Sequence, residues 1–304
     1  MPRRIKRPAI AAALATSVVM AANAHATTWV EVEHTCPIGG EEFTAMEVAS
    51  NSYFGSRPDG RRYGPLPIVP VTECPSNGLP LFDDFSDEEL ALLEPAIAMP
   101  EFVSMRASET QRYRVAWLME QLGRAPVDIA STLLVATWEA DGNFDQKTRY
   151  QGEYVMLVTG IERTEENADS WFFLHTRAAN ALRELGYFEE AANLITRINR
   201  EEYFPDDTEI RGYVEQYFAN LGALVAEENY VVEPANMVPT YQAAMRCGLA
   251  LPLPTASEVP VCESEEVTEL IEDFEIEDDE GNDLEGRAAF EYLRNQRSAA
   301  NEGS

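Results

Sequence analysis

The sequence predicts a mainly α protein: an array of antiparallel helix hairpins preceded by a small domain of turns and β-structure. Three observations lead to this prediction. Prolines are spread through residues 37–80, where no helical period is present. Helical patterning then runs from Ser86 to about Cys247, interrupted only by short turns. Turns this short place consecutive helices side by side and antiparallel.

Residues 1–26 have the three parts of a signal peptide. A cationic start is followed by an apolar run at residues 9–22, which is shorter than a bilayer span, and by the small-x-small pattern of a cleavage site at Ala24-His25-Ala26. We therefore expect a mature protein that begins at Thr27, is periplasmic or secreted, and is not inserted in a membrane after cleavage.

The charge balance narrows the range of partners. Four of the 23 basic residues and none of the 53 acidic residues lie in the predicted signal peptide, which leaves 19 basic residues in the rest of the chain. A field this negative repels nucleic acid and anionic lipid, and it favours cations or basic protein surfaces. Solubility alone is the simpler explanation of the acidity.

Four cysteines follow the predicted signal peptide: Cys36, Cys74, Cys247 and Cys262. An even number in an exported chain favours disulfides. Four cysteines permit three connectivities, and proximity along the chain favours Cys36–Cys74 with Cys247–Cys262.

The predicted N-terminal domain, residues 27–85, contains two related turns. Cys36-Pro37-Ile38-Gly39-Gly40 and Cys74-Pro75-Ser76-Asn77-Gly78 each follow the CPxCG pattern of a zinc ribbon, but Gly39 and Asn77 replace the second cysteine of each turn. Two thiolates leave zinc half-coordinated, so a disulfide is favoured over metal. His34 is a possible third ligand. Short apolar stretches at 29–32 and 68–71 are the candidate strands.

Residues 39–43 also spell GGEEF, the active-site motif of diguanylate cyclases. Such an enzyme needs a nucleotide-binding domain around the motif, whereas only twelve residues lie between the predicted cleavage site and Gly39. We therefore interpret the match as chance.

The predicted helical domain spans residues 86–250. A capping box at Ser86 and Glu89 opens its first helix. The further predicted helices are 108–122, 126–140, 145–160, 166–185, 187–200, 208–228 and 236–247.

The hairpin at residues 171–203 fits the middle of the tetratricopeptide pattern. Gly186 occupies the turn, Phe188 the aromatic position and Ala191 the close contact between the helices. In such hairpins the first helix lines a groove, so we expect its exposed face to hold a peptide. The candidate groove residues are Phe173, Thr176, Asn180 and Arg183. His175, beside Phe172 and Ala179, is expected to be a packed core histidine.

The composition changes in the last segment, residues 251–304. From Glu258 to Glu285 there are fourteen acidic residues and no basic one. This composition predicts a solvated, partly disordered tail, with a possible terminal helix at residues 284–297.

Paired CPxCG turns, a proline-rich connection and tetratricopeptide-like helices together resemble a bacterial family of unknown function that combines a zinc ribbon with helical repeats. The resemblance covers about residues 34–200, including residues 113–117 and 130–138. It implies a zinc ribbon, here degenerate, and brings no enzymatic role.

Other sequence motifs for catalysis are lacking. The chain has no GxSxG elbow and no glycine-rich phosphate loop, and an EF-hand counted from Gly281 would place Ile276 and Arg287 at ligand positions. We therefore expect a protein-interaction module for a peptide or protein partner, with no catalysis and no cofactor. The alternative is an envelope metal-binding protein that uses a residual zinc site or the acidic tail.

Overall fold

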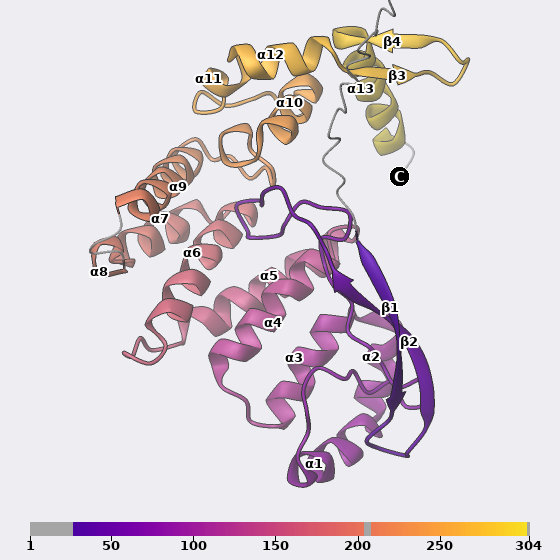
Figure 1. Cartoon of the computed structure of the whole chain (residues 1–304). Coiled ribbons are helices and arrows are strands. Elements are labelled where there is room, and N and C mark those ends of the chain that lie inside the picture. Colours follow the sequence, from indigo (N-terminus) through magenta and orange to yellow (C-terminus); the bar gives the residue numbers. More distant parts are fainter. Residues whose placement is uncertain (1–26, 204–207, 303–304) are drawn as a thin grey trace, which may run out of the picture.

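The computed structural model describes residues 27–203 and 208–302, so the predicted signal peptide lies outside the described residues. The described chain is mainly helical, with a small two-stranded antiparallel sheet at its N-terminal end (Figure 1). The strands are β1 (Thr28–Thr35), β2 (Glu42–Ser50), β3 (Glu275–Glu277) and β4 (Asp283–Glu285).

The first helices are α1 (Asp87–Ile97), α2 (Pro100–Ser108), α3 (Gln111–Gln121), α4 (Pro126–Glu139), α5 (Phe144–Thr159), α6 (Ala168–Glu184) and α7 (Phe188–Arg197). They are followed by α8 (Arg200–Tyr203), α9 (Thr208–Ala226), the 3-10 turn η1 (Ala235–Met237), α10 (Thr240–Leu249), α11 (Val259–Cys262), α12 (Glu265–Glu272) and α13 (Gly286–Glu302).

Every helix predicted between Ser86 and Cys247 is present, and the predicted capping box is formed. The Ser86 hydroxyl accepts from Glu89 N–H, and the Glu89 carboxylate accepts from Ser86 N–H at 2.9 Å. The sequence analysis did not predict α2 as a separate helix. It begins with a proline at its first position, directly after α1, where a missing N–H costs nothing.

The β1–β2 hairpin pairs Thr35 with Glu42 next to its turn and Glu31 with Met46 near its middle. The strand predicted at 29–32 lies within β1. The strand predicted at 68–71 is wrong, because the side chain of Gln111 accepts from Val71 N–H and donates to Val71 C=O, both at 2.6 Å. The Gln111 amide therefore binds the N–H and C=O groups of Val71 that a neighbouring strand would have to pair with.

Two hydrophobic clusters organise the region up to α9. The buried Cys36, Cys74 and Leu79 share one cluster with α1, α2 and α3. The larger cluster joins α3 to α7 and α9, in which consecutive helices pack against one another. His175 lies inside it, as predicted, stacked on Trp171 with ring centroids 3.8 Å apart.

The segment after residue 250 is folded, contrary to the partial disorder expected from its acidity. Helices α11, α12 and α13 pack around α10, and the strands β3 and β4 pack on α13, at one end of the molecule (top of Figure 1). A small number of apolar side chains suffices, because Val267, Ala289 and Phe290 are almost completely buried. The predicted terminal helix is present as α13.

Candidate functional site: a groove along the free edge of β2

Two turns of the same geometry hold the hairpin against the helices. Gly40 N–H donates to Cys36 C=O, and Cys36 N–H donates to Glu41 C=O; Gly78, Cys74 and Leu79 repeat both bonds at the same spacing, all at 2.8–3.1 Å. Gly40 and Gly78 take almost the same left-handed φ, +69° and +71°, which glycine adopts without strain. The two CPxCG-like segments therefore form equivalent turns.

The two turns face each other through their cysteines. Cys36 and Cys74 are paired at disulfide distance, with Cα atoms 5.7 Å apart, and Cys247 pairs with Cys262. The predicted connectivity is confirmed. Asn77, where the CPxCG pattern has its second cysteine, connects the turns in another way: its amide donates to Ile38 C=O and accepts from Leu79 N–H, both at 2.9 Å.

The turn also determines which backbone groups of β2 face away from β1. The bond from Cys36 N–H to Glu41 C=O makes this pair a hydrogen-bonded one. Hydrogen-bonded and non-bonded pairs alternate along an antiparallel ladder, so the N–H and C=O groups of Glu42, Thr44 and Met46 point outward. Among the described residues, no other strand pairs with this edge of β2.

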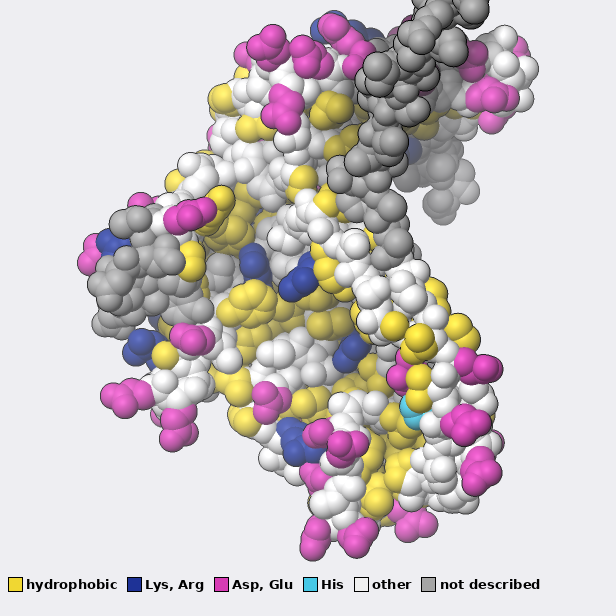
Figure 2. All heavy atoms as spheres, in the orientation of Figure 1, with side chains coloured by type: hydrophobic (Ala, Val, Ile, Leu, Met, Phe, Trp, Pro, Cys, Tyr) yellow, Lys and Arg dark blue, Asp and Glu magenta, His cyan; other side chains and the backbone are white. Residues whose placement is uncertain are grey.

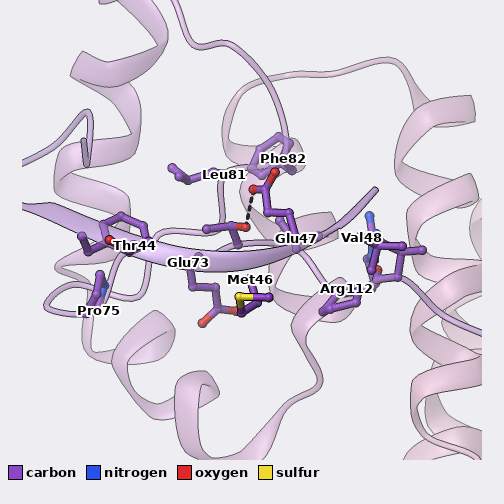
Figure 3. Close-up of a pocket in the computed structure, with 15 residues that line it drawn as sticks. Thr44, Met46, Glu47, Val48, Glu73, Pro75, Leu81, Phe82 and Arg112 are labelled. Atoms are coloured by element: carbon purple, nitrogen blue, oxygen red, sulfur yellow. Dashed lines mark hydrogen bonds between the residues drawn. The ribbon is translucent and has the colours of Figure 1, made fainter. Parts of the chain in front are cut away.

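A groove of about 650 Å³ follows this edge. Residues 43–48, six in succession, line it, and the hairpin contributes no residue of β1. A groove on the face of the sheet would be lined by alternate residues of both strands, so this one runs along the edge. In Figure 3, Glu47 and Phe82 lie on one side of β2, and Met46 and Glu73 lie on the other.

The opposite wall consists of residues 69–73 with Pro75, Leu81, Phe82 and Arg112. It is fixed by polar contacts to α3: besides the bonds of Gln111 to Val71, Glu73 accepts from Arg114 at 2.6 Å. Thr72 donates to Glu47 at 2.7 Å and so connects the two walls, as the dashed line in Figure 3 shows. The groove therefore has one wall held by α3 and one strand edge with which no described strand pairs.

The electrostatic character of the hairpin is acidic. Residues 28–50 contain five glutamates and neither lysine nor arginine. His34 Nε2 lies 3.0 Å from Glu47 Oε1, and its ring stacks on Phe43 across the strands. On the far wall, burial lowers the pKa of Arg112, partly offset by the charge of Glu139.

The groove predicted on α6 is wrong. Thr176 is buried, and Asn180 and Arg183 are completely inaccessible. Arg183 donates to Asn229 C=O and Val231 C=O, both at 2.7 Å, and to the side chain of Asn180. The connection after α9 covers this face, so only Phe173 of the four candidates is exposed.

The zinc site considered in the sequence analysis would need the thiolates of Cys36 and Cys74. In the structure these two cysteines are bonded to each other. His34 contacts Glu47, and no cluster of three or more potential metal ligands is found in the described part of the chain.

The sequence analysis did not identify the edge of β2. Its signal is weak, because the alternation of Phe43, Thr44 and Ala45 ends at the apolar Met46, and Glu47 then falls on the same face as Phe43 and Ala45. The opposite wall is distant in sequence, and its irregular backbone has no periodic signature.

Comparison with protein-family models, with curated proteins and with solved structures gave no match. Within the described ranges, no helix is long and apolar enough to cross a membrane.

Proposed function

We propose that this protein is an exported interaction module that binds an extended segment of a partner protein as an added strand along β2, without catalysis. The observation that carries the proposal is the groove lined by six successive residues of β2. An extended chain added there would pair with the outward N–H and C=O groups, and its alternate side chains would occupy the groove.

The surroundings of the edge support this mode of binding. The opposite wall is held by Gln111 and Arg114, so little ordering is needed on the protein's side when a peptide enters. Met46 and Val69 are exposed apolar side chains on the two sides of the groove. The glutamates of the hairpin favour a partner segment that carries basic side chains.

The helices serve as the scaffold. Their arrangement is proposed to be tetratricopeptide-like at α6 and α7, where Gly186 ends the first helix at φ +81° and Ala191 is fully buried between the two. This scaffold supports the wall of the groove rather than supplying the binding surface, because its inner face is filled.

Export is part of the proposal. The two cysteine pairs at disulfide distance are compatible with an oxidising compartment. The predicted signal peptide would direct the chain to such a compartment.

The test is a proline placed at the outward edge. Met46→Pro removes an N–H that points away from β1. An edge strand tolerates proline at such a position, because no ladder hydrogen bond is lost. Peptides are first selected from a displayed random library on the immobilised wild-type protein. Their affinity for the Met46→Pro variant should be at least about tenfold lower, because backbone pairing and side-chain contacts are lost together. Affinity is measured by calorimetry, and folding by circular dichroism.

Glu31→Pro is the matched control. Glu31 is the direct cross-strand partner of Met46, so the same change removes an outward N–H from the opposite edge of the same sheet. The Glu31→Pro variant should bind the selected peptides with the same affinity as the wild type. If the two variants lose affinity equally, or if the selected peptides bind both unchanged, the groove along β2 is not the binding site.

A further inference from the structure

A second cavity, of about 740 Å³, lies where the N-terminal loop, the helical stack and the C-terminal segment meet. Its walls come from Arg57, Arg61 and Tyr63, the start of α5, residues 231–233, α10 and α13. It is separate from the groove along β2, with which it shares no lining residue. Its volume is in the range of cavities that hold small molecules.

Basic side chains are concentrated on its walls although the protein is strongly acidic. The walls carry five cations and two carboxylates, in a chain with 53 acidic and 23 basic residues. The cations are Arg57, Arg61, Lys147, Arg246 and Arg297; the carboxylates are Asp141 and Glu233.

Three of the cations are neutralised by buried carboxylates behind the wall. Arg57 contacts Asp59 at 2.6 Å, Lys147 lies 3.6 Å from Glu184, and Arg246 lies 3.0 Å from Glu258. These pairs fix the wall and do not by themselves attract a ligand.

Arg61 differs from these three. Asp141, its nearest carboxylate at 3.4 Å, already accepts from Arg57 and Lys147, each at 2.8 Å. The Nε of Arg61 faces Asp141, but the Arg61 side chain is 25% exposed, whereas those of Arg57, Lys147 and Arg246 are 4%, 11% and 6% exposed. An anionic ligand in the cavity can therefore reach the guanidinium of Arg61 and form charge-assisted hydrogen bonds with it.

The remaining wall is apolar. Phe144 is 81% exposed and Leu251 is 46% exposed, both unusually open for side chains of their size, and Met245 and Leu249 lie beside them on the cavity wall. Burial of this surface would stabilise the apolar part of a ligand.

We propose that the cavity binds a small amphiphilic anion, with its carboxylate or sulfonate at Arg61 and Arg297 and its apolar part against Phe144 and Leu251. Glu233 is 40% exposed on the same wall and repels such an anion. The site is independent of the groove along β2 and would survive the failure of the peptide-binding proposal.

The probe is 8-anilinonaphthalene-1-sulfonate, which carries a sulfonate on an aromatic body and fluoresces when its aromatic part leaves water. Arg61→Gln and Arg297→Gln should each weaken binding by about tenfold, the effect of losing one charge-assisted hydrogen bond. Glu233→Gln should strengthen binding, since it removes a like charge. Arg62→Gln, at the exposed neighbour of Arg61 and outside the cavity wall, is the matched control and should change nothing.

Competition identifies the source of the ligand. Dodecanoate should displace the probe and dodecyltrimethylammonium should not. A hexapeptide that ends in a free leucine carboxylate, compared with its amide, tests whether a peptide terminus supplies the same chemistry; displacement by the acid alone would make the terminus the source. Unchanged affinity in both arginine variants, or weaker binding in Glu233→Gln, would overturn the proposal.

Discussion

The guanidinium of Arg183 donates to two backbone carbonyls of the connection that follows α9, and this contact removes a polar face of α6 from solvent. The spacing of Thr176, Asn180 and Arg183 is that of an exposed helix face, and sequence periodicity cannot distinguish it from a face covered by another segment. The covering segment begins 46 residues later in the chain, at Asn229. At this scale, long-range backbone contacts decide whether a polar residue binds a partner or stabilises the core.

His175 allows a prediction on the pH dependence of stability. Burial lowers its pKa from 6.5, the bond of its ring nitrogen to Trp171 C=O works in the opposite direction, and the charge of Arg197 lowers it further. Below pH 6.5 the unfolded chain therefore binds a proton that the folded chain does not accept. Stability is complete above this pH and falls as the pH decreases toward the lowered folded pKa, with a slope of up to about 1.4 kcal/mol per pH unit.

His175→Asn should flatten this slope between pH 7 and pH 5, whatever it does to absolute stability. The measurement is urea unfolding at several pH values, compared with the wild type. An unchanged slope in the variant would show that other groups produce the acid sensitivity.

At the scale of elements, the hairpin and the proline-rich connection are held by the two equivalent turns. The sequence analysis predicted their equivalence from the repeated CPxCG-like spelling, and both turns form. Gly39 and Asn77 stand where the CPxCG pattern has its second cysteine. Cys36 and Cys74 are paired with each other, and the amide of Asn77 makes two hydrogen bonds. The two turns are thus joined by a disulfide and by a polar bridge.

Removal of this disulfide should destabilise the protein more than removal of the second one. The Cys36–Cys74 pair closes a sequence separation of 38 and the Cys247–Cys262 pair a separation of 15. Loop-closure entropy gives a loss of about 4 kcal/mol for Cys36→Ala with Cys74→Ala, and about 3 kcal/mol for Cys247→Ala with Cys262→Ala. Chemical denaturation of both variants tests the order, and a larger loss from the shorter loop would contradict it.

At the scale of the whole molecule, charge is distributed unevenly. On the face seen in Figure 2, acidic side chains lie mainly along the outer margin, and several basic ones lie in the hollowed middle among apolar side chains. The contacts agree with this separation, since Arg57, Lys147 and Arg183 are buried with Asp59 and Glu184. Several ion pairs are therefore internal, whereas pairs such as Arg149–Glu153 and most of the acidic side chains seen on this face lie at the surface.

This distribution predicts stabilisation by salt. The net formal charge is −30, and repulsion among surface carboxylates is screened as the Debye length falls from about 30 Å at 0.01 M to about 8 Å at 0.15 M salt. Each kcal/mol of repulsion removed should raise Tm by about 2–4 °C. Thermal unfolding in sodium chloride and in choline chloride measures the effect without dependence on one cation. A fall in Tm would mean that the internal ion pairs contribute more than the surface repulsion costs.

The helical character of residues 86–247, the capping box, the two equivalent turns and the pairing of the cysteines could all be predicted from the sequence. These features depend on neighbours close in the chain, or on covalent chemistry that few residues can perform. Three features could be seen only in the tertiary structure: α6 is covered, the acidic C-terminal segment is folded, and no described strand pairs with the edge of β2 beside the wall held by Gln111. Each depends on contacts between distant segments, and neither helical periodicity nor composition carries information about which segment will supply them.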